Sequence, residues 1–169
     1  MNIPFLDLKA QYKNISTEIL QKLKDVINKT AFVSGPYVEE FEKSFAEFCE
    51  TKYCVALNSG TSALHVALLA HGVKPGDEII TVPNSFIATS WAISYCGAKP
   101  VFVDVDPNTF LIDHNLIESK ITSKTKVILP VHLYGQHLEI DLINKIAQKY
   151  NLIVIEDAAQ AHASKYRGK

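Results

Sequence analysis

The chain has 169 residues, of which 47% are hydrophobic and 21% charged, a composition typical of a globular protein that buries a sizeable core. Its 17 basic and 18 acidic residues give a formal net charge of −1 without a long run of one sign, which argues against nucleic acid as a partner. No stretch reaches the roughly 18 apolar residues of a membrane span, and the N-terminus lacks the apolar core of a signal peptide. We therefore expect a cytoplasmic protein without a membrane partner.

The cysteines, Cys49, Cys54 and Cys96, lack the spacing of a zinc site or of a disulfide framework. Their odd number fits a reducing compartment. We expect each of them to be a small buried hydrophobic residue, and we expect no metal site.

Two amphipathic helices are predicted in the first fifty residues. Apolar side chains recur at helical spacing from Ile15 to Ile27 and again from Val38 to Phe48, and Pro36 is well placed to open the second helix. The segment IPFLDL before them is expected to form an arm. These elements predict an N-terminal region over residues 1–50, followed by a domain over residues 51–169.

From residue 51 onward, short apolar strands alternate with helix-length segments. The expected strands are YCVAL (53–57), EIITV (78–82), KPVFVDV (99–105), KVILPVHL (126–133) and LIVIED (152–157). This alternation predicts an α/β fold with a mostly parallel sheet. The helix expected over residues 62–71 is apolar nearly all round, so we expect it to be buried against the sheet. Gly72, Gly76 and Gly97 mark helix ends where left-handed backbone is expected.

Residues that follow the strands identify a candidate site, because the carboxyl ends of parallel strands share one edge of the sheet. The segment NSGTSAL starts a helix after the strand at 53–57, and its free amides and hydroxyls suit an anion such as phosphate. The alternative is an ordinary Ser/Thr cap. No nucleotide-binding glycine motif is present in the segment.

An aromatic ring and a carboxylate follow two other strands at the same edge. Phe86 comes after the strand at 78–82, and Glu156 and Asp157 end the last strand. Phe86 could be a core residue, and Asp157 could simply end a strand. Together with the anion site, they suggest a pocket for a flat, phosphorylated, nitrogen-containing ring.

The same stretches carry a family resemblance over nearly the whole chain. FLDL, FVSGPYVEEFE, ALNSGTSALHVAL, GDEIITVPNSFIAT, AKPVFVDVD, PVHLYG and IEDAAQAH occur in order with similar spacing. The chain resembles the N-terminal half of the DegT/DnrJ/EryC1/StrS aminotransferases of nucleotide-sugar biosynthesis. The resemblance implies the type I fold of enzymes that use pyridoxal 5'-phosphate, with residues 51–169 as the first half of the cofactor-binding large domain.

The resemblance also implies roles for individual residues. Gly60, Thr61 and Ser62 correspond to the loop that holds the cofactor phosphate, and Phe86 to the aromatic residue stacked on the pyridine ring. Asp157 corresponds to the acid that pairs with the ring nitrogen, where a charge-assisted hydrogen bond keeps the nitrogen protonated. Gln160 corresponds to the residue near the ring hydroxyl. His162 occupies the matching histidine position, near the cofactor or in a structural role.

This sequence departs from the family pattern at two places. Ala163 replaces a common glycine, which we expect to tighten the local backbone. No segment of the SFxxxK type, which carries the Schiff-base lysine in the family, follows the acidic loop, and neither Lys165 nor Lys169 matches it. We therefore assign no catalytic lysine. We expect this chain to belong to a longer architecture and to be inactive alone.

The resemblance implies transfer of an amino group from glutamate to a keto sugar of a nucleoside diphosphate sugar, by a homodimer when full length. The alternative is a relative that lacks the lysine and binds pyridoxal or pyridoxamine phosphate, as a sugar dehydratase or as a non-catalytic binding fragment. A hydrolase reading, with Ser59, Asp157 and His162 in chain order, is disfavoured because the GxSxG motif is absent.

Overall fold

The computed structural model describes residues 3–168 and divides into two compact units, one up to Ala56 and one from Leu57 onward. Within residues 3–168 no helix combines the length and the apolar character needed to cross a bilayer. The boundary expected at residue 50 stays a prediction.

The first unit contains the predicted amphipathic helices, which are α1 (Leu8–Asn28) and α2 (Pro36–Phe48). Asp7 caps α1 by accepting a hydrogen bond from an amide of the first turn, at 3.0 Å. Pro36 opens α2 as predicted, because its missing N–H costs nothing at the first helical position. The ring of Phe45 packs against those of Phe41 and Phe48, with centroid separations of 5.4 and 6.0 Å. The helical spacing of apolar residues therefore predicted both helices correctly.

The strand predicted at residues 53–57 was wrong, since this segment pairs with no strand of the described chain. The amide of Ala56 donates to the carboxylate of Glu42 in α2, at 2.8 Å. A run of strand-forming residues becomes a strand only where a neighbouring backbone accepts its hydrogen bonds, and here a side chain takes that place.

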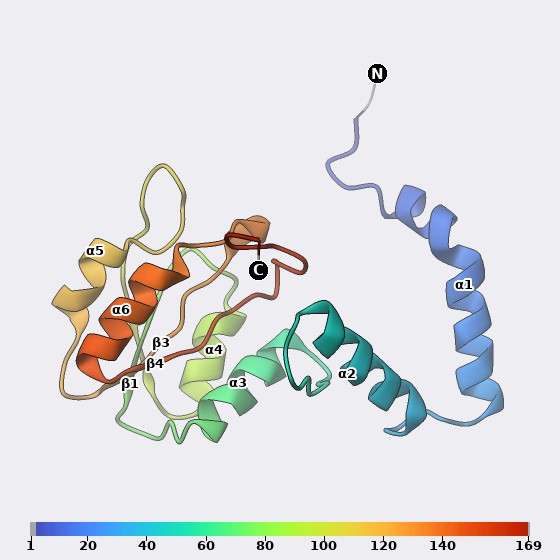
Figure 1. Cartoon of the computed structure of the whole chain (residues 1–169), viewed down its shortest axis with the longest axis horizontal. Coiled ribbons are helices and arrows are strands. Elements are labelled where there is room, and N and C mark those ends of the chain that lie inside the picture. The colour runs from blue at the N-terminus through green and yellow to red at the C-terminus, as the bar shows by residue number, and fades with distance from the viewer. Residues whose placement is uncertain (1–2, 169) are drawn as a thin grey trace. The chain divides into compact units, whose positions relative to one another are not determined.

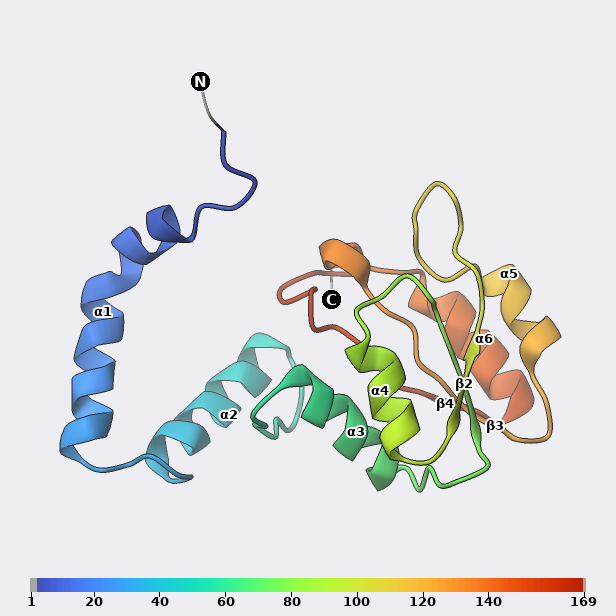
Figure 2. The same cartoon turned by 180° about the vertical axis from the view of Figure 1, so that it is seen from behind.

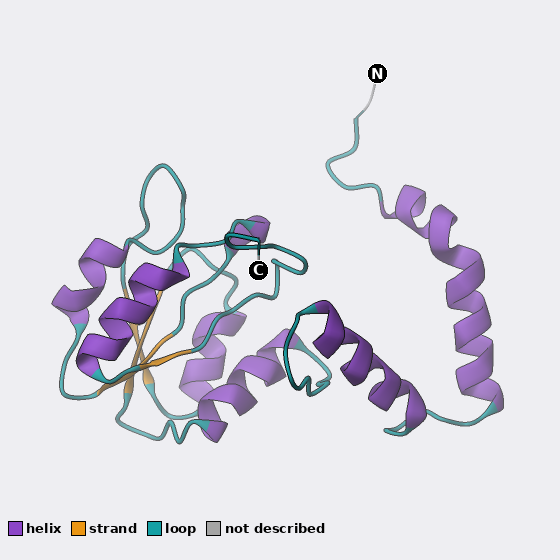
Figure 3. Cartoon of the chain, in the orientation of Figure 1, coloured by secondary structure: helices purple, strands orange, loops and turns teal. Residues whose placement is uncertain are grey.

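The second unit is built on a parallel sheet, whose strands are orange in Figure 3. The strands are β1 (Glu78–Thr81), β2 (Lys99–Phe102), β3 (Thr125–Ile128) and β4 (Ile153–Val154). The helical segments are α3 (Gly60–Ala70), α4 (Ala88–Tyr95), α5 (His114–Ile117), η1 (Glu118–Lys120), η2 (Leu133–Gly135) and α6 (Ile140–Tyr150). The spatial order is β2-β1-β3-β4, and each neighbouring pair is parallel. This confirms the predicted α/β fold with a mostly parallel sheet.

Helices cover both faces of this sheet. Figures 1 and 2 show α3 and α4 on one side of the strands and α5 and α6 on the other. Consecutive strand residues face opposite sides, so Ile79 joins the core beneath α3 and α4, whereas Ile80 joins the core beneath α6. Val127 and Ile128 divide in the same way. The near-continuous apolar strands of the sequence follow from burial on both faces.

Helix α3 is buried along only one side. Leu64 and Leu68 are buried in the core of the second unit. Val66 and Leu69 are 45% and 49% exposed, so the expectation of burial all round was wrong. The single sheet face that α3 contacts can cover one stripe of a helix but not its whole circumference.

The cysteines differ in burial. Cys96 is buried in the core as expected, but Cys49 is exposed and Cys54 is intermediate, and all of them are free thiols. Cys49 follows α2 directly, where the chain leaves the apolar stripe of that helix. Burial therefore depended on the position in an element and not on the residue type.

Gly97 holds a tight turn between α4 and β2. Its φ of +69° lies in the left-handed region, and a Cβ atom there would come within 2.8 Å of Cγ of Pro75. Gly76 has a φ of +94° with no heavy atom within 4 Å of the same position. A substitution at Gly76 therefore meets only the cost of the left-handed backbone, whereas a substitution at Gly97 also meets the contact with Pro75.

We predict that Gly97→Ala destabilises the chain more than Gly76→Ala. The left-handed conformation costs an alanine about 1–2 kcal/mol, and Gly97→Ala adds the contact with Pro75 to that cost. Urea unfolding of both variants measures the difference in the free energy of unfolding. Equal losses would show that the Pro75 contact relaxes freely.

Candidate functional site

Asp157 lies where the backbone after β3 pairs with the backbone after β4. Its amide donates to the carbonyl of Pro130 at 2.9 Å, and its own carbonyl accepts from the amide of His132 at 3.1 Å. Val131 and Asp157 form a parallel bridge three residues beyond the last pair of the ladder between β3 and β4, Ile128 and Val154. The position of Asp157 is therefore set by main-chain pairing at the carboxyl edge of the sheet.

The Asp157 carboxylate is buried and hydrogen-bonded, with only 6% of the residue exposed. Oδ2 accepts from the hydroxyl of Thr89 at 2.8 Å, and Oδ1 accepts from the amide of Ala159 at 3.2 Å. Thr89 belongs to the first turn of α4 and is itself buried. Because its single proton goes to Asp157, its oxygen accepts from Ser85 at 3.0 Å. A chain of hydroxyls thus stabilises the buried acid.

No pattern in the sequence singles out Thr89, which lies 68 residues from Asp157. The only local signal is the spacing of Ser85 and Thr89, four residues apart, which places hydroxyls one helical turn from each other. Phe86 lies between them in the loop after β1, and its carbonyl accepts from the Thr89 amide at 3.2 Å. The ring of Phe86 is 67% exposed, so it is not a core residue.

The start of α3 lies against the acidic loop, which is the segment IEDAAQAH (155–162) after β4. The position of a Cβ on Gly60 would be 3.6 Å from Cβ of Ala159, two residues after Asp157. Ser59 caps the helix by accepting from the Ser62 amide at 3.1 Å. The amides of Gly60 and Thr61 lie in the first turn, where no earlier turn provides a carbonyl. The ordinary cap and a set of amides suited to an anion therefore occur together.

Gln160 and His162 lie on the exposed part of the acidic loop. The side-chain oxygen of Gln160 accepts from the amide of Tyr134 in η2 at 2.8 Å, which ties the loop to that turn. The structure thus brings Asp157 and its loop to the start of α3 and to η2. The cofactor roles expected for Gly60, Thr61, Ser62, Phe86, Asp157, Gln160 and His162 stay predictions.

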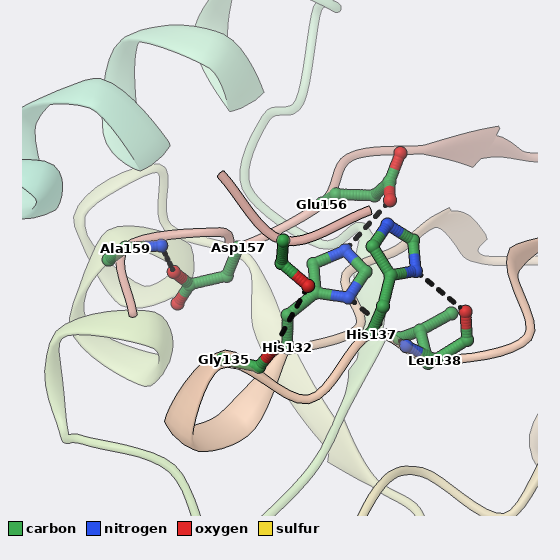
Figure 4. A network of polar contacts seen from close by, with 8 residues as sticks. His132, Gly135, His137, Leu138, Glu156, Asp157 and Ala159 are labelled. Atoms are coloured by element: carbon green, nitrogen blue, oxygen red, sulfur yellow. Dashed lines mark hydrogen bonds and ion pairs between the residues drawn. The ribbon is translucent and has the colours of Figure 1, made fainter. Parts of the chain in front are cut away.

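Glu156 has a partner that the sequence did not indicate. Its Oε2 lies 2.8 Å from Nε2 of His132, which is only 2% exposed, and Figure 4 shows His137 beside the same carboxylate. The hydrogen bond from His132 lowers the pKa of Glu156, although burial acts in the opposite direction. His132 and Glu156 are 24 residues apart, and the segment PVHLYG offered no local pattern that linked them.

Ala163 adopts the left-handed conformation, with a φ of +64°. We expected the replacement of glycine by alanine to tighten the backbone here. The structure shows the alanine in a left-handed conformation, which is strained relative to glycine because alanine has a Cβ atom.

A family comparison identifies the group of proteins to which this chain is related. Residues 13–169 match the DegT/DnrJ/EryC1/StrS aminotransferase family. The chain belongs to this family. The resemblance seen in the sequence motifs is thereby confirmed.

Relatives in this aminotransferase family are similar along the whole chain. The "Pleiotropic regulatory protein" of Geobacillus stearothermophilus is 47% identical over 169 residues, which cover 100% of this chain and 45% of the relative. The "UDP-2-acetamido-2-deoxy-3-oxo-D-glucuronate aminotransferase" of Pseudomonas aeruginosa is 45% identical over 99% of this chain and 46% of its own length. The chain thus spans slightly less than half of the length of these relatives.

Solved structures of the family share the fold. DesV of S. venezuelae, determined with a ketimine intermediate, gives a TM-score of 0.96 at 41% identity and covers 99% of this chain and 45% of its own. NtdA of Bacillus subtilis, with bound cofactor PMP, gives 0.91 at 45% identity over 95% of this chain and 37% of its own. A GDP-4-keto-6-deoxymannose-3-dehydratase with a trapped PLP-glutamate geminal diamine gives 0.82 at 31% identity over 89% of this chain and 40% of its own.

We predict that Ala163→Gly stabilises the chain by about 1 kcal/mol, because glycine adopts the left-handed conformation without the Cβ penalty. Ala158→Gly is the matched control in the same loop, since Ala158 does not have a positive φ. That control should destabilise by about 0.4–1 kcal/mol through the greater freedom of the unfolded chain. Urea unfolding of both variants tests the opposite signs, and a loss of stability in both would refute the strain at Ala163.

We predict that ionised Glu156 stabilises the fold only above its own pKa. A lowered pKa means that the contribution is complete above the ordinary glutamate value of about 4.3 and is lost as the pH falls through the folded value. Glu156→Gln keeps an acceptor for His132 but cannot ionise. The free energy of unfolding, measured in urea from pH 7 down to pH 3, should therefore differ most between wild type and variant at neutral pH. A difference that does not change with pH would contradict the assignment.

Proposed function

We propose that the protein containing this chain is an aminotransferase that uses pyridoxal 5'-phosphate and transfers an amino group from glutamate to a keto sugar of a nucleoside diphosphate sugar. The observation that carries the proposal is the buried Asp157 carboxylate at the carboxyl edge of a parallel sheet, beside the start of α3, in a member of this aminotransferase family. The name of the Pseudomonas relative and the bound PMP of NtdA support the substrate class and the cofactor.

The residues at this edge fit such a cofactor. A carboxylate oxygen with two lone pairs has room for a further donor after it accepts from Thr89 or Ala159, so Asp157 suits a protonated ring nitrogen. The amides of Gly60 and Thr61, at the positive end of α3, suit a phosphate. The exposed ring of Phe86 offers an apolar face for a flat heterocycle.

Each of these residues then has a defined task. Asp157 keeps the proton on the ring nitrogen, and Thr89 and the Ala159 amide hold the carboxylate in place. Gly60, Thr61 and Ser62 bind the phosphate, Phe86 covers the ring, and Gln160 and His162 lie on the loop beside it. When bound, the cofactor supplies an electron sink for the carbanion formed at the substrate. We assign no lysine of this chain to the covalent step.

A dehydratase without the Schiff-base lysine is the second candidate. The observation that favours it is the likeness to the dehydratase structure, which shares the fold at 31% identity. Both functions use the same cofactor contacts in this chain, so the residue at the lysine position separates them. Borohydride reduction of the longer protein with pyridoxal phosphate fixes the cofactor covalently only where a lysine is present. The homodimer and the cytoplasmic location expected from the sequence stay predictions.

We predict that Asp157→Asn weakens the binding of pyridoxal phosphate by about 10–150-fold, because a hydrogen bond to a charged group contributes about 1.5–3 kcal/mol. Fluorescence titration of the chain and of the longer protein that contains it measures the dissociation constant. Asp113→Asn is the matched control, since Asp113 caps α5 and asparagine caps helices equally well. Unchanged affinity in Asp157→Asn would contradict the proposed contact.

An amino-transfer assay tests the function itself. The longer protein, supplied with pyridoxal phosphate, glutamate and a nucleoside-diphosphate keto sugar, should release 2-oxoglutarate. Asp157→Asn should abolish most of this turnover, whereas Asp113→Asn should retain it. Failure of the wild-type protein to transfer an amino group to any such sugar would count against the proposal.

A further inference from the structure

Glu156 and Asp157, the acidic pair that follows β4, make contacts on opposite sides of the chain. Glu156 and Asp157 are consecutive residues of extended chain, so their side chains point in opposite directions. Figure 4 shows Asp157 directed toward Ala159 and Glu156 directed toward His132 and His137. The Asp157 side meets Thr89 of α4, and the Glu156 side meets the segment after β3. The two side chains of the pair are therefore held by different elements, one on each side of the chain.

His132 contacts both residues of the pair. Its amide donates to the Asp157 carbonyl at 3.1 Å, and its Nε2 lies 2.8 Å from Oε2 of Glu156. Its Nδ1 accepts from the amide of Leu138 at 3.3 Å. Because an amide N–H only donates, Nδ1 carries no proton, and in the neutral ring the proton lies on Nε2 and is donated to Glu156. The surrounding hydrogen bonds thus select one tautomer of a buried histidine.

A metal site is the competing explanation for this cluster. One ligand atom each from His132, His137 and Glu156 lie within 4.8 Å of one another, and two histidines with one carboxylate form a known zinc ligand set. His137 would suit a metal, since its Nδ1 donates to the carbonyl of Leu138 at 2.8 Å and leaves Nε2 as a ligand atom. His132 would not, because the Leu138 amide uses the lone pair of Nδ1 and the proton occupies Nε2. The hydrogen-bond pattern therefore favours a proton-mediated contact.

We propose that His132 is a positioning residue for the Asp157 carboxylate, acting through the side chain of Glu156 and the backbone of Asp157. His132 holds the strand end from one face, and Thr89 holds it from the other. The effect on cofactor binding rests on the proposed function of Asp157, but the effect on the carboxylate itself does not.

NMR of the cofactor-free chain tests the structural part. In wild type, the imidazole ¹⁵N shifts should show His132 protonated at Nε2 and not at Nδ1. His132→Phe should change the ¹³C shift of the Asp157 carboxylate and expose its amide to hydrogen exchange, because Glu156 loses its donor. His132→Gln retains a side-chain N–H that can donate to Glu156 and should restore both signals. His71→Gln, at an exposed histidine that ends α3, is the matched control.

Cofactor affinity gives the functional readout. Where wild type binds pyridoxal phosphate, His132→Phe should weaken binding about tenfold, and His132→Gln should recover most of that loss. If wild type binds no cofactor, the proposed function fails, and the Asp157 carboxylate shift still decides the positioning role. If His132→Phe does not fold, the wild-type tautomer and the His132→Gln spectrum remain as tests.

Three results would overturn the proposal. The first is an unchanged Asp157 carboxylate signal in folded His132→Phe. The second is equal damage in His132→Phe and His132→Gln, which would indicate a purely steric role. The third is stoichiometric Zn²⁺ binding that shifts the ring signals of His132 and His137, which would make the cluster a metal site.

Discussion

The parallel pairing of the chain after β3 with the chain after β4 determines the geometry of the candidate site. The bonds from the Asp157 amide to Pro130 and from the His132 amide to Asp157 extend the sheet beyond its regular ladder. They place a carboxylate at the edge where the neighbouring loops and the start of α3 come together. The main chain thus sets where the carboxylate lies, and the hydrogen bonds from Thr89 and from the Ala159 amide set its orientation.

A buried carboxylate is stable only with hydrogen-bond donors, because removing an unpaired charge from water is costly. At Asp157 the donors come from different parts of the unit, the hydroxyl of Thr89 in α4 and the amide of Ala159 in the acidic loop. Thr89 in turn requires the loop of Ser85 and Phe86 to open α4 at the correct register. The packing of α4 against the sheet is therefore part of the electrostatics of the site.

The sequence predicted those features of the fold and of the candidate site that depend on residues close together in the chain. The alternation of short apolar segments with helix-length segments predicted the strands β1, β2, β3 and β4. The position of Asp157 after the last strand placed it at the carboxyl edge of the sheet. It could not predict Thr89 or His132, since their contacts with the acidic pair depend on how loops far apart in sequence meet in space. It also predicted a strand at residues 53–57, because residue preference does not reveal whether a neighbouring backbone is available.

The strain at Ala163 is tolerated because contacts on both sides fix the acidic loop. Before it, the Ala161 amide donates to the Ala158 carbonyl at 2.9 Å; after it, the Ser164 hydroxyl donates to the Gly135 carbonyl at 2.9 Å. Farther along, the Tyr166 ring stacks on His137 with centroids 5.4 Å apart. A residue held between such anchors keeps a conformation that an isolated alanine would leave, since leaving it would break the neighbouring hydrogen bonds. The loop that carries Gln160 and His162 is thus fixed by the turn after β3, the same segment that supplies His132.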